Sequence, residues 1–260
     1  MNFISSKSNI KIKETAKLFS SSKHRSQNGL FVIEGIRLCF DAYKSGVKIK
    51  SVFITENCLE KCKNDAEKVI DYAEESYIVT TEVMKYISDT VSPQGIVCVC
   101  EFITAKVEVS DNLKAAVLFD IADPSNIGTI SRTAEAFGID ILIVCGGCDI
   151  YNPKALRASM GALFRLPVLN FNEDEVFEFF KKNDIISFAS TPRSTAEKVT
   201  EISFPNKAAM LIGNEANGLR EEIIQKCDRA VTIPMLGRAE SLNAAAAAAI
   251  LLFELVREGL

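Results

Sequence analysis

The sequence predicts an α/β protein of two domains, and three observations support this fold class. Predicted strands and helices alternate through both halves of the 260 residues, as they do in layered α/β domains. The segment 103–113 is less apolar and has no clear period, which marks a domain boundary. Beyond it the strands are continuous apolar runs, which are typical of buried parallel strands. We therefore expect a first domain at residues 1–103 and a second at 114–260.

The first domain is predicted to be a small α/β sandwich. Apolar positions at helical spacing predict a helix at 9–19, and the polar residues 20–29 predict a loop. A short strand at 30–33 is followed by a helix that ends near Gly46. Further strands are predicted at 51–54, 77–80 and 95–102, with helical segments between them.

The second domain is predicted to be a mostly parallel sheet covered by helices on both faces. It begins with the apolar run 115–119. Further strands are predicted at 141–145, 185–189, 208–212 and 230–233, and helices at 153–164, 174–181 and 241–257. The alanine run at 244–249 favours a helix with little side-chain bulk, so another helix of this chain or of a second copy can approach it closely.

Charge is divided unevenly along the chain. Residues 1–50 contain ten Lys and Arg against three Asp and Glu, a balance of +7, and the remainder contains 20 against 31, a balance of −11. The basic end is where a polyanion would bind, although ordinary surface lysines give the same count. No apolar run reaches the roughly 18 residues that span a bilayer, and the N-terminus lacks a signal-peptide pattern. We expect a cytoplasmic protein with no membrane partner.

Cysteine and histidine usage excludes several kinds of site. The eight cysteines have no repeated spacing that would indicate a disulfide framework. Cys145-Gly-Gly-Cys148 has the spacing of a redox or zinc pair, but it has no second pair and no nearby histidine, so a small apolar residue that closes a strand is favoured. The only histidine is His24, which excludes a Ser/His/Asp triad and a multi-histidine metal site. We expect no metal.

Three polar clusters interrupt the second domain, each after a predicted strand, where parallel α/β sheets bind ligands. In the cluster 123–134, the start of a helix needs one polar residue as its N-cap. This explains one of the polar residues but does not explain Arg132. In the cluster 213–218, two glycines flank Glu215, which by itself also fits a simple turn. In the cluster 233–243, Ser241 is a candidate N-cap, and Asn243 falls within the first helical turn.

None of the clusters is a GxGxxG fingerprint or a GxxxxGK[ST] phosphate loop. A dehydrogenase would also need an acidic residue about 20 positions after its glycines. The sequence therefore disfavours both a Rossmann dehydrogenase and a P-loop NTPase.

These clusters resemble the three motifs of the SpoU/TrmH superfamily of RNA ribose methyltransferases, in order and in spacing. The motifs are Asn126-Ile-Gly128-Thr-Ile-Ser-Arg132-Thr133-Ala134, Gly213-Asn-Glu215-Ala-Asn-Gly218-Leu219, and Ile233-Pro234-Met235 with Ser241-Leu242-Asn243. The first domain resembles the family's substrate-binding module, which is similar to ribosomal protein L30e, through Phe31-Val-Ile-Glu34-Gly35 and Ser92-Pro93-Gln94-Gly95. Ala122 and Ser125 depart from residues that are common in the family, which bears on the subfamily.

The resemblance implies a fold, a methyl donor and an assembly. The second domain would be an α/β-knot of the SPOUT type, with a deep trefoil knot that forms the pocket for S-adenosylmethionine (SAM). The implied cofactor-binding residues are Thr191, Gly213, Asn214, Gly218, Ile233, Met235 and Leu242. The protein would act as a homodimer through its C-terminal domain, with Arg132 reaching a site that the second subunit completes.

The resemblance also implies a reaction: transfer of a methyl group from SAM to a ribose 2'-hydroxyl of structured RNA, with 23S-type ribosomal RNA preferred. Arg132 would bind the phosphate beside the target ribose, because its planar fork suits an oxyanion. The residues that would position the reactants are Asn126, Glu215, Ser241 and Asn243, and the candidate RNA contacts are Lys23, Arg25 and Arg37. The alternatives are a tRNA 2'-O-methyltransferase, a non-catalytic RNA-binding ribosome factor and an α/β enzyme acting on a small nucleotide.

Overall fold

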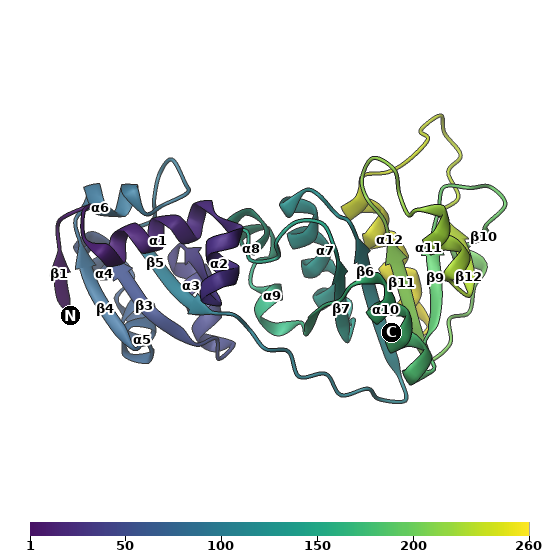
Figure 1. The fold of residues 1–260 in the computed structure, drawn as a ribbon, viewed down its shortest axis with the longest axis horizontal. Helices are drawn as coiled ribbons and strands as arrows, with labels where there is room; N and C mark the ends of the chain where they lie inside the picture. Colours follow the sequence, from purple (N-terminus) through teal and green to yellow (C-terminus); the bar gives the residue numbers. More distant parts are fainter. Residues whose placement is uncertain (260) are drawn as a thin grey trace. The chain divides into compact units, whose positions relative to one another are not determined.

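The computed structural model describes residues 1–259, which form two compact units (Figure 1). The first unit consists of Met1–Thr104 and Asp149–Phe164, and the second of the other described residues. Each unit is built on one sheet.

The first unit contains a five-stranded mixed sheet in the order β1-β4-β3-β5-β2. The strands are β1 (Asn2–Ile4), β2 (Leu30–Glu34), β3 (Ile49–Ile54), β4 (Glu75–Val79) and β5 (Ile96–Glu101). β4 is parallel to both β1 and β3, whereas β5 is antiparallel to β2 and β3. The predicted strands of this half are confirmed, and β1 is a strand that the sequence pattern did not indicate.

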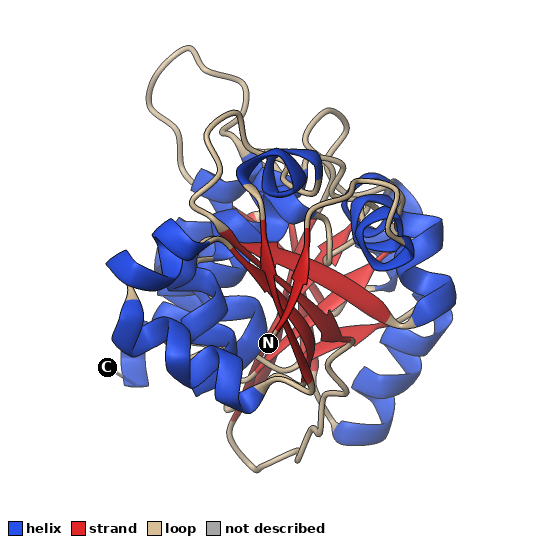
Figure 2. Cartoon of the chain, turned by 90° about the vertical axis from the view of Figure 1, so that its left-hand side faces the viewer, coloured by secondary structure: helices blue, strands red, loops and turns tan. Residues whose placement is uncertain are grey.

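Helices lie on both sides of the strands (Figure 2). Those of the first half are α1 (Ile10–Ser20), α2 (Ser22–Asn28), α3 (Ile36–Lys44), α4 (Glu56–Lys61), α5 (Lys63–Tyr72) and α6 (Thr81–Tyr86). Ile12 and Leu18 of α1 and Met84 of α6 pack with Val32 and Phe53 of the sheet in one apolar core.

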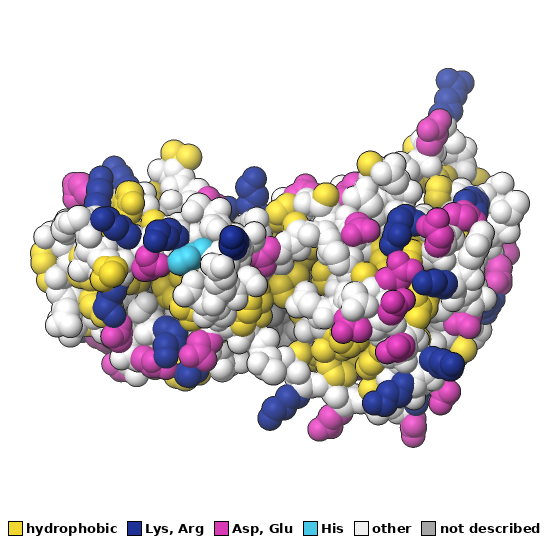
Figure 3. All heavy atoms as spheres, viewed as in Figure 1, with side chains coloured by type: hydrophobic (Ala, Val, Ile, Leu, Met, Phe, Trp, Pro, Cys, Tyr) yellow, Lys and Arg dark blue, Asp and Glu magenta, His cyan; other side chains and the backbone are white. Residues whose placement is uncertain are grey.

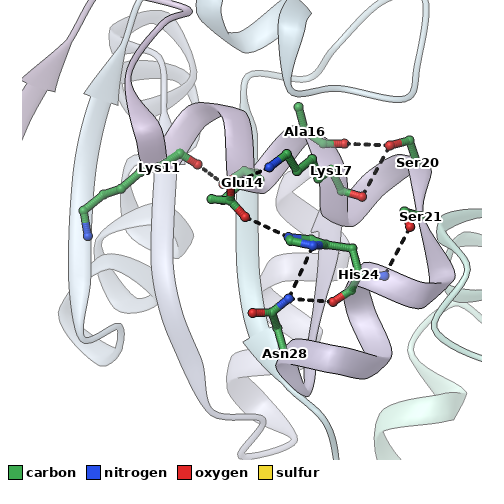
Figure 4. Close-up of polar contacts among 9 residues, drawn as sticks. Lys11, Glu14, Ala16, Lys17, Ser20, Ser21, His24 and Asn28 are labelled. Atoms are coloured by element: carbon green, nitrogen blue, oxygen red, sulfur yellow. Dashed lines mark hydrogen bonds and ion pairs between the residues drawn. The ribbon is translucent and has the colours of Figure 1, made fainter.

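The prediction of a loop at 20–29 is wrong, because α2 occupies most of that segment. The Ser21 hydroxyl accepts from the His24 amide at the start of α2, and Gly29 ends the helix at φ 63°. The His24 imidazole lies 2.9 Å from the Glu14 carboxylate of α1 (Figure 4). Capping and contacts with α1 therefore stabilise a helix whose polar sequence has no apolar period.

Residues 149–164 pack with the first unit although they follow β7 in the chain. They contain α8 (Pro153–Ser159) and the start of α9 (Ala162–Arg165), separated by Met160 and Gly161, which have φ values of 49° and 83°. The Tyr151 ring stacks on Phe31 and Phe102, with centroids 4.7 Å and 4.1 Å away. The single helix predicted at 153–164 is thus two short helices, broken by left-handed backbone.

The second unit contains a seven-stranded sheet, all of whose strand pairs are parallel, in the order β10-β12-β9-β11-β6-β7-β8. The strands are β6 (Leu113–Phe119), β7 (Ile141–Cys145), β8 (Val168–Asn170), β9 (Ile186–Ser190), β10 (Glu197–Lys198), β11 (Lys207–Ile212) and β12 (Arg229–Thr232). The predicted parallel sheet is confirmed.

Both faces of this sheet are covered, which explains the continuous apolar run of β6. The helical elements are α7 (Pro124–Ala136), α10 (Glu173–Asn183), η1 (Val199–Glu201), α11 (Glu221–Lys226), α12 (Ala244–Val256) and η2 (Arg257–Gly259). Val176 of α10 and Ile223 of α11 pack on Val117 and alternate β6 residues. α7 and α12 contact each other, and α12 also contacts β6 and β11.

Candidate active site

The turns after β9, β11 and β12 line one cavity at the C-terminal edge of the parallel sheet. These three strands are neighbours in the sheet, so their carboxyl ends lie side by side. The cavity has a volume of about 230 Å³. Its lining includes all seven predicted cofactor-binding residues, Thr191, Gly213, Asn214, Gly218, Ile233, Met235 and Leu242.

The cavity's chemistry fits a ligand that has an apolar ring and a polar tail. Val231, Ile233 and Leu251 supply apolar surface, while Thr191 and Ser241 supply hydroxyl groups. A mainly apolar lining with a few polar groups is usual for small-molecule sites. SAM, with its adenine ring and amino-acid end, has this combination.

Glu215 lies at the centre of a hydrogen-bonded cluster that joins two of the motifs. Its Oε1 accepts from the Asn126 side chain at 2.8 Å and from the Asp123 amide at 3.1 Å, and its Oε2 accepts from the Ala122 amide at 3.1 Å. Partial burial raises the pKa of Glu215, but these donors outweigh it and the net pKa is lowered. Glu215 is therefore held as an oriented carboxylate.

Asn243 connects the third motif to the same cluster. Its Nδ2 donates to Asn126 Oδ1 at 3.3 Å, and its Oδ1 accepts from the first amides of α12. Asn243, and not Ser241, is the N-cap of α12, so the interpretation of Ser241 as a cap is wrong. Ser241 lines the cavity instead. One asparagine thereby sets both the start of α12 and the position of Asn126.

Arg132 lies outside the cavity. Asn126 is 8% exposed on the covered side of α7, whereas Arg132 is exposed on the other side of that helix. Within residues 1–259, no hydrogen bond or ion pair engages its guanidinium. The structure thus brings together Asn126, Glu215, Ser241 and Asn243, and leaves Arg132 directed to solvent.

The two glycines of the second motif are required by the backbone geometry of the turn that they form. A Cβ on Gly213 would lie 2.2 Å from the Gly218 carbonyl carbon and 2.3 Å from the Leu219 nitrogen, so only glycine allows the turn to close on itself. Gly218 has φ 65°, which favours glycine. Sequence reasoning assigned these glycines to ligand approach, and the structure adds this more local reason.

The sequence analysis did not predict the groups in the turn after β6 that hold the Glu215 cluster in place. The Asn214 side chain donates to the Asp120 carbonyl at 2.8 Å, and the amides of Ala122 and Asp123 bind Glu215. The only signal in the sequence was their place directly after the β6 run. The missed cavity-lining residues are Ser190, Pro192, Ile212, Ala216, Asn217, Val231, Thr232, Ala244, Ala247 and Leu251.

The three candidate RNA contacts in the first unit differ in exposure. Lys23 and Arg37 are exposed, and both basic and acidic side chains lie around the single histidine (Figure 3). Arg25 is only 3% exposed, and it donates to Asp149 Oδ2 at 2.7 Å and to the Leu18 carbonyl at 2.6 Å. The expectation that Arg25 contacts RNA is corrected, because its guanidinium is already engaged inside the unit.

Among residues 1–259, no group of three or more His, Cys, Asp and Glu side chains is placed to hold a metal ion. No helix in the same range is both long and apolar enough to cross a bilayer. All eight cysteines are present without disulfide bonds.

Comparisons with known proteins agree with this architecture. Residues 114–253 match the SpoU rRNA Methylase family, and residues 9–98 match the MRM3-like substrate binding domain. A 23S rRNA guanosine 2'-O-methyltransferase of Bacillus subtilis is 30% identical over 256 residues, which cover 98% of this chain and 99% of the relative.

Two solved structures also cover both chains almost completely. An AdoMet-bound rRNA methyltransferase from Sinorhizobium meliloti superimposes with a TM-score of 0.90 at 28% identity, over 100% of this chain and 98% of that chain. The SpoU methyltransferase AviRb from Streptomyces viridochromogenes, in complex with AdoMet, gives 0.87 at 27% identity, over 96% and 98%. The chain belongs to the SpoU rRNA methylase family.

Proposed function

We propose that this protein transfers the methyl group of SAM to a ribose 2'-hydroxyl of ribosomal RNA. The observation that carries the proposal is the cavity formed by three adjacent strand ends, with Asn126, Glu215 and Asn243 joined at its edge. Relatives that match nearly the whole chain are named as 23S rRNA 2'-O-methyltransferases. These names support ribosomal RNA over tRNA, and AdoMet-bound neighbours support an enzyme over a non-catalytic factor.

When bound, SAM supplies a sulfonium whose methyl group is open to in-line attack. Thr191, Asn214, Ile233, Met235 and Leu242 would hold it. The chain's own contribution is to align the attacking oxygen, and orientation alone can supply about 7–11 kcal/mol. Exclusion of water by the apolar lining assists the same step.

The charged groups have distinct roles in this proposal. Glu215 accepts three hydrogen bonds and has a lowered pKa, so it orients neighbouring groups and is poorly suited to take a proton at neutral pH. Arg132 carries a permanent charge in a fork that suits a phosphate. We therefore assign Arg132 to the RNA phosphate beside the target ribose.

We propose a homodimer formed through the C-terminal unit. Ala246, Ile250 and Phe253 recur at helical spacing on the exposed side of α12, and the last two remain 38% and 40% exposed. The Phe253 ring contacts Phe137, at the end of α7, with centroids 5.6 Å apart. An apolar stripe on one helix, next to the helix that carries Arg132, fits a second copy of the chain. In such a dimer Arg132 would serve the partner's site.

We make three further proposals, on the roles of the two halves of the chain, on its path and on the location of the protein. Residues 1–103 would form the RNA-binding domain, with Lys23 and Arg37 as contacts, and residues 114–260 the methyltransferase domain. The order of strands and turns in the second unit would follow a trefoil-knotted path. We also propose a cytoplasmic location, which the proposed ribosomal RNA substrate supports.

The test compares wild type with Arg132→Ala and with a matched surface variant, Arg220→Ala. Labelled SAM and ribosomal RNA are the substrates, and 2'-O-methyl sites are mapped. Loss of a charged hydrogen bond of about 1.5–3 kcal/mol predicts a roughly tenfold to hundredfold fall in kcat/KM for RNA in the Arg132 variant only. Undiminished turnover would remove Arg132 from the site. Absence of both SAM binding and methylation in the wild type would refute the proposed function.

A further inference from the structure

The turn that contains Gly146 and Gly147 packs directly against the turn that follows β6. β6 and β7 are neighbours, with Phe119 opposite Cys145. Beyond the strands, the Asp120 amide donates to the Cys145 carbonyl and the Cys148 amide donates to the Ile121 carbonyl, both at 2.9 Å. The two turns are therefore hydrogen-bonded at both ends.

No side chain fits between these turns. A Cβ on Gly147 would lie 2.4 Å from the Ile121 oxygen and 2.8 Å from the Ile121 nitrogen, both backbone atoms. A Cβ on Gly146 would lie 2.2 Å from Asp120 Oδ1, which is the end of a side chain. Substitution at Gly147 must therefore move the backbone, whereas substitution at Gly146 must displace the Asp120 side chain.

The turn after β6 is held from its other side by the second motif. The Asn214 side chain donates to the Asp120 carbonyl at 2.8 Å, and Asp120 itself has φ 53°, which is uncommon for a residue other than glycine. The next two amides, of Ala122 and Asp123, donate to Glu215. The direction of these amides depends on the backbone between Asp120 and Asp123.

We propose that Gly146 and Gly147 are positioning residues for the Asn126–Glu215 pair. Their turn supports Ile121 from behind, so that the amides of Ala122 and Asp123 meet the Glu215 carboxylate. This inference rests on the proposed function for its catalytic consequence, but its geometric content can be tested separately. It gives the Cys145-Gly-Gly-Cys148 sequence a role other than redox or metal chemistry.

The thiol of Cys145 agrees with a scaffolding role. Cys145 is 8% exposed. Burial, followed by the nearby Asp120 carboxylate, raises the pKa of Cys145 to about 11. A thiol that stays protonated at neutral pH is a poor nucleophile and a poor metal ligand.

The experiment uses Gly147→Ala, with Gly46→Ala as the matched control. Gly46 has φ 72°, close to the 80° of Gly147, but a Cβ there would meet nothing within 4 Å. Both variants therefore carry similar backbone strain, and only Gly147→Ala carries the collision. A second set compares Gly146→Ala, Asp120→Gly and the double variant, because glycine at 120 removes the atom that an alanine at 146 would strike.

Two readouts are taken from the full-length protein. Carboxyl NMR titration reports the apparent pKa of Glu215 without any substrate, and methyl transfer from SAM to ribosomal RNA reports kcat. We expect Gly147→Ala to raise the pKa of Glu215 towards its ordinary value and to lower kcat by about 10²-fold, as for a misplacement of about 1 Å. Gly46→Ala should leave both unchanged. Gly146→Ala should change both in the same direction but by less, because it displaces only the Asp120 side chain, and Asp120→Gly should reverse that change.

The outcomes separate this inference from the proposed function. A wild-type Glu215 titration in folded Gly147→Ala protein overturns the inference, whether or not the enzyme methylates RNA. A shifted titration in a protein that never methylates RNA supports the inference and refutes the proposed function. If Gly147→Ala does not fold, failure of Asp120→Gly to restore the Glu215 titration of Gly146→Ala overturns it.

Discussion

Replacing Asn126 with Asp places a second carboxylate against Glu215 while almost preserving shape. Asn126 is 8% exposed, and its Nδ2 lies 2.8 Å from Glu215 Oε1. The substitution turns this donor into an acceptor, so a charge-assisted hydrogen bond becomes a repulsive pair. One of the two carboxyl groups must then take up a proton or the two must separate.

The size of the effect follows from this contact. Loss of a hydrogen bond to a charged group costs about 1.5–3 kcal/mol. Two unit charges about 4 Å apart repel by about 1 kcal/mol in water and about 4 kcal/mol at an effective dielectric constant of 20. Since Glu215 is exposed, we expect a repulsion of about 1–2 kcal/mol, towards the lower limit of that range. The total of about 2.5–5 kcal/mol corresponds to a fall in Tm of roughly 5–20 °C.

The repulsive part must depend on pH. A carboxyl group whose folded pKa is raised binds a proton more readily in the folded state than in the unfolded state, so its destabilisation grows as pH rises above its ordinary pKa. The Tm deficit of Asn126→Asp should therefore be larger at pH 8 than at pH 5. In the wild type the opposite sign applies, because the lowered pKa of Glu215 provides stability above 4.5 that is lost as pH falls further.

Thermal unfolding at several pH values checks this prediction. Asn126→Ala removes the donor without adding charge, so its deficit should not grow between pH 5 and pH 8. Asn64→Asp, at an exposed position in α5, adds the same charge far from Glu215 in sequence and in another unit. Equal deficits for Asn126→Asp at pH 5 and pH 8 would refute the proposed contact between Asn126 and an ionised Glu215.

Two further predictions concern the first unit and the dimer. Arg25→Ala should lower the free energy of unfolding by about 3–5 kcal/mol because it breaks a buried ion pair. Lys23→Ala should change the free energy of unfolding by less than about 0.5 kcal/mol but should weaken RNA binding. Equal unfolding curves for the two variants would contradict the role given to Arg25. Ile250→Asp should raise the dissociation constant of the dimer at least tenfold, which corresponds to about 1.4 kcal/mol. Sedimentation measures this constant, and Val91→Asp, which changes another exposed apolar residue, is the control. A wild-type protein that sediments as a monomer would exclude the dimer.

The parallel sheet of the second unit was predictable because its strands are buried on both faces. Leu113–Phe119 has its apolar residues covered on both sides, so the sequence lacks the alternation of a half-exposed strand. The position of the motifs directly after such runs then predicted that they meet at one edge. The order of the strands was not predictable from residue patterns, and it is this order that places the turns after β9, β11 and β12 around one cavity.

Other features could not be predicted because they depend on partners that are distant in sequence. Arg25 belongs to a basic segment, but the Asp149 carboxylate, 124 positions later, engages it in the interior. α2 has no apolar period and depends on Ser21, Gly29 and a contact with Glu14 of α1. Charge counts and apolar periodicity consider only residues that are close in sequence. In both cases a contact between residues distant in sequence determines the structure.

The proposed site works by orientation, as the state of its charged groups indicates. The hydrogen bonds to Glu215 come from two amides and from Asn126, and a carboxylate so engaged is a weak base. Arg132 is always cationic, and the only histidine, His24, is bound to Glu14 within the first unit. None of the residues that line the cavity is a histidine, a cysteine or a lysine. The chain's contribution is therefore to orient a hydroxyl, a methyl donor and a phosphate relative to one another. This explains why the turns after β6, β7 and β11, the second of which contains Gly146 and Gly147, all fix the position of the Glu215 carboxylate.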